Sequence, residues 1–130
     1  MRLVHDPDGA RRVVAERVEV ADTLPARARG LMFRRSFSGS RALAFPFERA
    51  AWRSLPLVPD GPGRRSLHML FVPFPIDAVW VVDGRVERVK RLAAWTGRGG
   101  APADVVYELP AGRADPLSVG DRLALVPSPE

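Results

Sequence analysis

The sequence predicts a mainly β domain, small and sandwich-like or barrel-like, with seven or eight short strands and one or two short helices. Short runs of β-branched and aromatic residues recur along the chain and are typical of strands. Clusters of Gly, Pro and Asp separate these runs at close intervals. No long helical repeat lies between them, which argues against a doubly wound α/β fold. The 130 residues fit a single domain.

The N-terminal part predicts a hairpin followed by a short helix. Leu3-Val4 and residues 12–20 read as two strands joined by the Asp/Gly turn at residues 6–9. Residues 22–30 then read as a helix, because Thr23 can cap it and Gly30 can end it.

The middle of the chain holds its most apolar stretch. Residues 67–71 and 76–82 are the strongest strand candidates, and we expect them to form a hairpin through a loop at residues 72–75. An irregular surface excursion at residues 48–66 precedes them, with three prolines and two glycines in its second part. The remaining expected elements are a strand at 42–47, a turn at Asp83-Gly84, an edge strand at 86–92, a Gly-rich loop at 96–102, a strand at 105–109, a turn with a short helical piece over 110–117, a strand at 122–126 and a tail at 127–130.

The net charge of +5 is uneven and comes almost entirely from arginine. Nineteen of the twenty basic residues are Arg, and Lys90 is the exception. Residues 1–65 hold 13 basic and 7 acidic groups, whereas residues 66–130 hold 7 and 8. An anion-attracting surface is therefore expected in the first half. No nucleic-acid motif accompanies it, so a solvated Arg-rich face is favoured and anionic-polymer binding is kept as an alternative.

Composition also bounds compartment and chemistry. The chain has no cysteine, which excludes disulfides and thiolate sites and is compatible with a reducing cytoplasm. Asp6, Pro7, Asp8 and Gly9 interrupt any signal-peptide pattern, and no apolar run is long enough to span a membrane. We expect a cytoplasmic, soluble protein without a membrane partner.

The predicted hairpin contains the one candidate for catalysis. If residues 72–75 form a four-residue loop, His68 and Asp77 become diagonal neighbours on one face of the hairpin. The imidazole of His68, beside the carboxylate of Asp77, could then act as a general base in a small hydrolase or isomerase. A slip of one residue separates them. Two histidines without ligand spacing argue against a metal site, and the glycines at 97, 99 and 100 lack the residues of a phosphate loop, so no cofactor is expected.

Candidate binding residues lie near another apolar run. Arg29 and Arg34 flank residues 31–33 and could clamp a carboxylate or phosphate, with Met69 and Glu108 as further candidates. The alternative, which we favour, is that the arginines pair structurally with buried acids, namely Asp77, Glu108 or Asp121.

Several segments together resemble the bacterial and archaeal family called domain of unknown function 192. They read Arg-Gly-Leu-Met-Phe-Arg at 29–34, His-Met-Leu-Phe-Val-Pro-Phe-Pro-Ile-Asp at 68–77 with Val79-Trp80, and Glu-Leu-Pro-Ala-Gly at 108–112 followed by Val-Gly-Asp at 119–121. The resemblance covers roughly residues 12–126 and implies a compact β-sandwich-like domain with no established activity, cofactor or substrate. The motif positions are Arg29, Gly30, Leu31, Met32, Arg34, Met69, Asp77, Glu108, Gly112 and Asp121.

The chain departs from this family in the length of its excursion at 48–66. Without a convincing nucleophile, metal set or cofactor loop, the sequence favours a non-enzymatic ligand-binding or accessory module. An anionic small molecule or a protein would be the expected partner.

Overall fold

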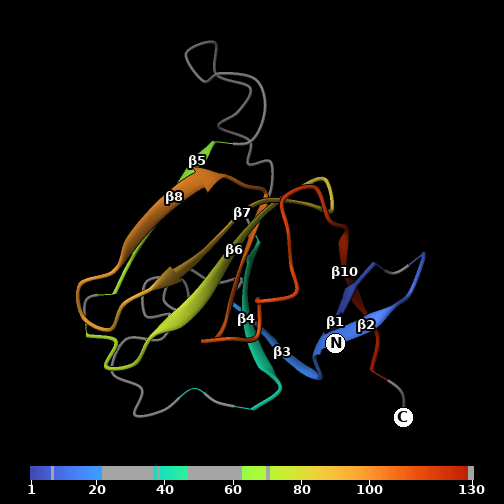
Figure 1. Ribbon diagram of the computed structural model, residues 1–130, viewed down its shortest axis with the longest axis horizontal. Coiled ribbons are helices and arrows are strands. Elements are labelled where there is room, and N and C mark those ends of the chain that lie inside the picture. The colour runs from blue at the N-terminus through green and yellow to red at the C-terminus, as the bar shows by residue number, and fades with distance from the viewer. Residues whose placement is uncertain (7, 22–36, 38, 47–62, 70, 129–130) are drawn as a thin grey trace.

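The computed structural model describes all residues except 7, 22–36, 38, 47–62, 70 and 129–130, and these residues form a mainly β domain (Figure 1). Ten strands are present in the described part of the chain, and no helix is. The strands are β1 (Arg2–His5), β2 (Arg12–Ala15), β3 (Arg17–Val20), β4 (Arg41–Pro46), β5 (Arg64–His68), β6 (Ile76–Val82), β7 (Arg85–Leu92), β8 (Arg98–Pro102), β9 (Val105–Pro110) and β10 (Leu123–Val126). The predicted mainly β class is confirmed.

A five-stranded sheet in the order β3-β4-β9-β6-β7 forms the centre of the fold. Strands β3 and β4 pair in parallel, and the other neighbours pair antiparallel. The charged strand β7 lies at the edge, as its pattern predicted. Asp83 and Gly84 both have positive φ, at 48° and 77°, which is the conformation of a type I′ hairpin turn between β6 and β7.

One face of the central sheet is covered by the small antiparallel sheet of β5 and β8 (Figure 1). Ala78 and Trp80 of β6 are fully buried on this face, and Leu67 and Ala101 pack on it from β5 and β8. We call this group the first core cluster; its buried members are Ala21, Leu43, Phe45, Met69, Val72, Ile76, Ala78, Trp80, Leu92, Ala101, Ala103 and Val106.

The other face is covered by the three-stranded sheet β10-β1-β2. Val79 and Val81 alternate with Ala78 and Trp80 along β6 and point to this side. The second core cluster contains Leu3, Ala15, Ala42, Ala44, Val79, Val81, Val86, Tyr107, Leu109, Ala114, Leu117 and Leu123. Because side chains pack on both of its faces, the central sheet is the middle of three layers.

The predicted hairpin between residues 67–71 and 76–82 is wrong. Strand β5 pairs with β8, and β6 pairs with β7 and β9, so the two segments belong to different sheets. Prolines at 73 and 75 remove backbone donors from the connection, and Phe71 takes a left-handed φ of 59°. The chain therefore crosses from the covering layer into the central layer. The predicted division of side chains between two faces still holds for β6.

Two further expectations are corrected. The predicted Gly-rich loop at 96–102 is largely strand β8, because its glycines let the strand lie directly on Trp80. The expected helical piece over 110–117 is a series of turns, in which the amides of Arg113, Asp115 and Leu117 each donate to the carbonyl three residues earlier. The predicted helix at 22–30 and residues 48–62 of the excursion lie outside the described residues.

The predicted N-terminal hairpin is confirmed, since β1 and β2 pair antiparallel. The second predicted strand, residues 12–20, divides at Glu16 into β2 and β3, which join different sheets. Among the described residues, no helix has the length and apolar character needed to cross a membrane.

Tyr107 provides a pH-dependent test of the second core cluster. Burial, with a smaller contribution from Asp104, raises the pKa of Tyr107 to about 12 from its ordinary 10.0. The unfolded chain therefore ionises this group first, and the stability that Tyr107 contributes is lost between pH 10 and about 12. We expect wild type to lose about 3 kcal/mol of unfolding free energy from this group over that range, and Tyr107→Phe to lack that loss.

Denaturant unfolding of both proteins at several alkaline pH values measures the difference, and other titrating groups cancel between them. Tyr107 is the single tyrosine in the chain, so the absorbance of its phenolate reports its pKa directly. Ionisation at the ordinary value would contradict the burial of Tyr107.

Candidate functional site

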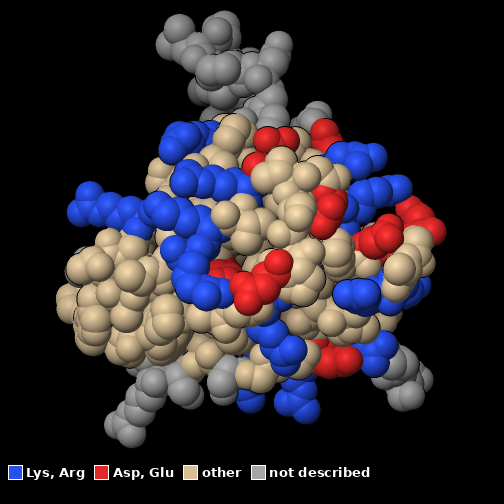
Figure 2. All heavy atoms as spheres, in the orientation of Figure 1, with Lys and Arg blue, Asp and Glu red and all other residues tan. Residues whose placement is uncertain are grey.

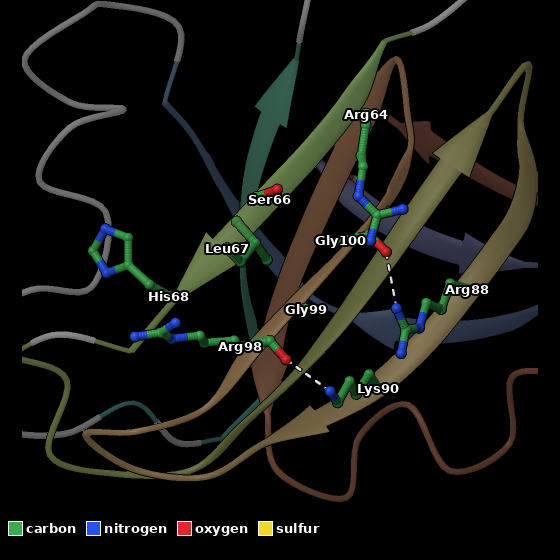
Figure 3. A pocket seen from close by; sticks show the side chains of 9 residues that line it. All are labelled: Arg64, Ser66, Leu67, His68, Arg88, Lys90, Arg98, Gly99 and Gly100. Carbon is green, nitrogen blue, oxygen red and sulfur yellow. Dashed lines mark hydrogen bonds between the residues drawn. The ribbon is translucent and has the colours of Figure 1, made fainter.

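A groove of about 530 Å³ lies where β5 and β8 meet the edge strand β7 (Figure 3). Its lining is dominated by the cationic side chains of Arg64, Arg88, Lys90 and Arg98. The remaining lining residues are Ser66, Leu67, His68, Gly99 and Gly100. We call it the basic groove.

Alternation along β5 places part of this lining at the surface. Arg64, Ser66 and His68 share one face of β5 and are exposed, whereas Leu67 turns toward the first core cluster. The register pairs His68 with Arg98 and Ser66 with Gly100, so these partners share that outer face of β8.

The other two cations reach the groove from the central sheet. Arg88 and Lys90 lie opposite Trp80 and Ala78, on the face that β8 covers. The Arg88 Nη1 donates to the Gly100 carbonyl at 2.8 Å, and the Lys90 Nζ donates to the Arg98 carbonyl at 2.7 Å (Figure 3).

These two carbonyls lie on the edge of β8 that faces away from β5. The Met69 amide donates to the Gly97 carbonyl, so the backbone groups of the odd-numbered residues of β8 form hydrogen bonds with β5. The backbone carbonyls of Arg98 and Gly100 therefore point away from β5. Two charged side chains thus take the place of a neighbouring strand and fix β8 to β7.

Trp80 forms the floor beneath these contacts. The Arg88 guanidinium lies 5.8 Å from the centre of the Trp80 ring, within the range of a cation–π interaction. The indole Nε1 of Trp80 donates to the Arg65 carbonyl at 2.7 Å. The cations are therefore held by rigid elements of the fold rather than projecting from loops.

The electrostatic character of the groove is one-sided. No Asp or Glu lines it, and within the described residues none of its four cations forms an ion pair with a carboxylate. Figure 2 shows basic side chains over much of the visible face, including the side where β5 and β8 lie. Adjacent charges of one sign raise the local concentration of anions.

Such a groove suits recognition of carboxylate or phosphate groups. Guanidinium groups present planar pairs of donors to these anions, and the volume lies in the range of small-molecule sites, about 300–1,000 Å³. The described residues contain no group of three or more His, Asp or Glu placed to hold a metal ion.

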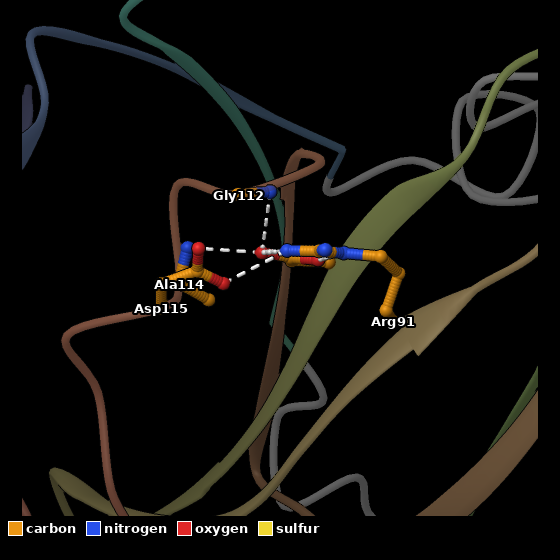
Figure 4. A network of polar contacts seen from close by, with 5 residues as sticks. Arg91, Gly112, Ala114 and Asp115 are labelled. Carbon is orange, nitrogen blue, oxygen red and sulfur yellow. Dashed lines mark hydrogen bonds and ion pairs between the residues drawn. The ribbon is translucent and has the colours of Figure 1, made fainter.

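A second polar centre surrounds Asp77 in β6, whose side chain is only 3% exposed. Figure 4 shows Arg91, Gly112, Ala114 and Asp115 gathered at this centre. Its Oδ2 accepts the backbone amides of Gly112 and Ala114 at 2.9 and 3.0 Å. Its Oδ1 accepts the Arg91 Nε at 2.8 Å, and Arg91 also donates to Asp115 at 2.8 Å. The hydrogen bond with Asp77 is the first cause that raises the pKa of Arg91. All these contacts fix the turn after β9.

Asp121 fixes the other end of the same segment. Its Oδ2 accepts the Ser118 amide at 2.9 Å and contacts the His5 Nε2 at 2.8 Å. The Ser118 hydrogen bond, followed by the contact with His5, outweighs burial and lowers the pKa of Asp121. We call residues 111–121, held by Asp77 and Asp121, the clamped loop.

The structure separates the predicted catalytic pair. Asp77 lies opposite Leu109, which places it on the face of the second core cluster. His68 belongs to β5, which covers the opposite face. The structure therefore does not bring His68 and Asp77 together. Asp77 pairs instead with Arg91, an arginine that the sequence analysis did not propose as its partner.

The structure describes two of the four predicted binding residues. Met69 is 1% exposed and belongs to the first core cluster. Glu108 is buried and lies opposite Leu43 and Ala78, facing the same cluster. Arg29 and Arg34 lie outside the described residues.

Sequence reasoning missed the cations of the basic groove. Three of them, Arg88, Lys90 and Arg98, come from the half of the chain whose net charge is slightly negative. The available signal was the alternation of Arg88, Lys90 and Leu92 on one face of β7. Only the pairing of β8 with β5 shows that this face meets another strand.

Two crystal structures have similar folds. A protein of unknown function from Novosphingobium aromaticivorans has 22% identity and a TM-score of 0.74, covering 96% of this chain and 84% of that one. A protein from Sinorhizobium meliloti, described as a candidate transcription regulator, has 23% identity and a TM-score of 0.71, covering 95% and 91%. At these identities the likeness shows the fold alone.

No curated protein matches the sequence. The family model of domain of unknown function 192, described as an uncharacterised ACR, matches residues 4–125, which is nearly the whole chain. The resemblance stated from the sequence is confirmed: the chain belongs to this uncharacterised family.

Proposed function

We propose that this protein is a non-enzymatic binding module whose basic groove takes an anionic ligand carrying several carboxylate or phosphate groups. The observation that carries the proposal is the set of four cations on rigid strands around one groove, without a carboxylate in its lining. Buried or paired arginines are ordinary architecture, and Arg91 is an example. The four groove cations differ, because no described acid balances their charge.

Arg64 and Arg98 are the two best candidates for direct contact with the ligand. Both are exposed on the outer face of the β5–β8 sheet, and neither guanidinium has a hydrogen bond among those described. Arg88 and Lys90 already donate hydrogen bonds to β8 carbonyls, and they add positive charge to the lining of the basic groove. This division separates the ligand-contacting cations from those that also maintain the fold.

The test measures the affinity of wild type and of two double variants for tripolyphosphate and for citrate by isothermal titration calorimetry. In the double variant Arg64→Glu/Arg98→Glu we expect the affinity for both anions to fall by about a hundredfold, the equivalent of two lost charge-assisted hydrogen bonds. Thermal unfolding without ligand should change little, since both residues are exposed.

The matched control is Arg11→Glu/Arg17→Glu, which makes the same change in net charge at two exposed positions, one just before β2 and one in β3. This control should retain the groove affinity within about threefold, because exposed charges beyond a Debye length are largely screened. Equal losses in both double variants would mean that net charge, and not the groove, attracts anions. That result would contradict the proposal.

A further inference from the structure

Two exposed aromatic residues lie in the loops that follow β5 and precede β8, the two strands that carry most of the basic groove. Phe71 is 44% exposed and Trp95 is 57% exposed. Both have a left-handed backbone, with φ of 59° and 66°, which is rare for bulky residues. Their loops are joined, because the Trp95 amide donates to the Val72 carbonyl at 3.0 Å. A strained backbone under an exposed indole, as at Trp95, is a reason to look for a function at this residue.

The chain path places this aromatic pair beside the groove. Phe71 follows His68 by three residues, and Trp95 precedes Arg98 by three, so each aromatic Cα lies within about 10 Å of a groove residue. His68 and Arg98 are cross-strand partners at the end of the β5–β8 sheet. The Met69 amide bonds the Gly97 carbonyl just beyond them and holds the two loops at that end.

We propose that the basic groove and Trp95 together bind single-stranded nucleic acid. The phosphates would lie along Arg64 and Arg98, and an unpaired base would stack on the exposed indole of Trp95. This inference rests on the proposed function, because the same cations bind the phosphates, and it adds the class of ligand. A cationic track with an adjacent aromatic surface is the arrangement by which proteins bind single strands without sequence preference.

The observations favour a single strand over a duplex and over a membrane. A duplex keeps its bases stacked and paired, so it offers nothing to an exposed indole beside the phosphate track. Membrane adsorption would use the charges without requiring a groove. The cations here line a hollow between β5, β8 and β7, which suits a chain of phosphates better than a flat layer of headgroups.

The test measures fluorescence anisotropy of a labelled oligothymidylate of about ten nucleotides, a length typical of one such site. We expect Trp95→Ala to weaken binding of this oligonucleotide about tenfold, and Trp95→Phe to restore most of the loss, because a phenyl ring also stacks on bases. An abasic oligonucleotide of equal length should bind wild type more weakly and should not respond to Trp95→Ala. Tripolyphosphate affinity should be unchanged in both Trp95 variants.

Each contrary outcome has a definite meaning. If tripolyphosphate binds but the thymidylate binds no better than its abasic counterpart, this inference fails while the proposed function stands. If neither anion binds, the proposed function fails as well. Trp95-dependent binding to vesicles of phosphatidylserine and phosphatidylcholine, without binding to the oligonucleotide, would replace the nucleic acid by a membrane surface and overturn the inference.

Discussion

Replacing Asp77 by alanine is expected to cost about 3–5 kcal/mol of unfolding free energy, a large part of the stability of a domain of this size. The substitution leaves the amides of Gly112 and Ala114 without their acceptor, and the Ala114 contact is fully buried. It also removes the partner of the Arg91 Nε. Urea or guanidinium unfolding, with the slope compared between proteins, measures the loss.

Asp115 provides the matched control for this variant. It accepts from the same Arg91 at 2.8 Å, but its side chain is 71% exposed. We expect Asp115→Asn to cost less than about 1 kcal/mol, as is usual for exposed ion pairs. Asp77→Asn should fall between the two, since it keeps one acceptor oxygen for the turn. Comparable losses in Asp77→Ala and Asp115→Asn would show that Asp77 does not hold the clamped loop.

The second large effect is expected at Gly99, where β8 lies on Trp80. A Cβ at this position would stand 2.9 Å from Trp80 Cη2 and 3.3 Å from Lys90 Cδ. The indole is 0% exposed and cannot move aside, so β8 would have to lift away from the central sheet. We expect Gly99→Ala to cost about 2–3 kcal/mol of unfolding free energy, as overpacked cores do.

Gly100→Ala is the control, because the neighbours of its Cβ would be the side chains of Arg64 and Ser66, at 3.1 to 3.2 Å. These exposed groups can turn away, so the cost should stay below about 1 kcal/mol. Gly99→Ala should also weaken anion binding, since lifting β8 separates the Arg98 and Gly100 carbonyls from Lys90 and Arg88. A stable Gly99→Ala variant with intact binding would contradict the close packing of β8 on Trp80.

Local patterns in the sequence predicted the class of fold but not the pairing of its strands. The alternation along residues 76–82 correctly separated Ala78 and Trp80 from Val79 and Val81. The same pattern could not show that β5 pairs with β8, thirty residues later, rather than with β6. Pairing between distant strands depends on tertiary contacts that no local pattern contains.

The predicted catalytic pair of His68 and Asp77 was wrong for the same reason. His68 and Asp77 form a pair only in a hairpin. In the structure His68 lies in the β5–β8 sheet that covers one face of the central sheet, whereas Asp77 belongs to the central sheet and projects from its other face. The groove needed Arg98 and Lys90 to meet across two sheets, and the glycines beside Arg98 looked like a loop in the sequence. At Gly99, Trp80 leaves no room for a side chain.

The segments that carry the family resemblance and the groove have different roles. Asp77, Gly112 and Asp121 belong to those segments, and all three take part in fixing the clamped loop. Of the residues that line the groove, His68 is the one within those segments. The short segments that carry the resemblance therefore belong mainly to the scaffold, and most of the residues that line the proposed groove lie between those segments.

The most direct test of the central claim is chemical-shift mapping of backbone amides during titration with tripolyphosphate. We expect the largest changes on residues 64–68 and 98–100, with smaller ones at Arg88 and Lys90. The clamped loop should remain unaffected. Changes centred instead on the clamped loop and His5, or spread evenly over all exposed arginines, would contradict the assignment of the basic groove as the functional site.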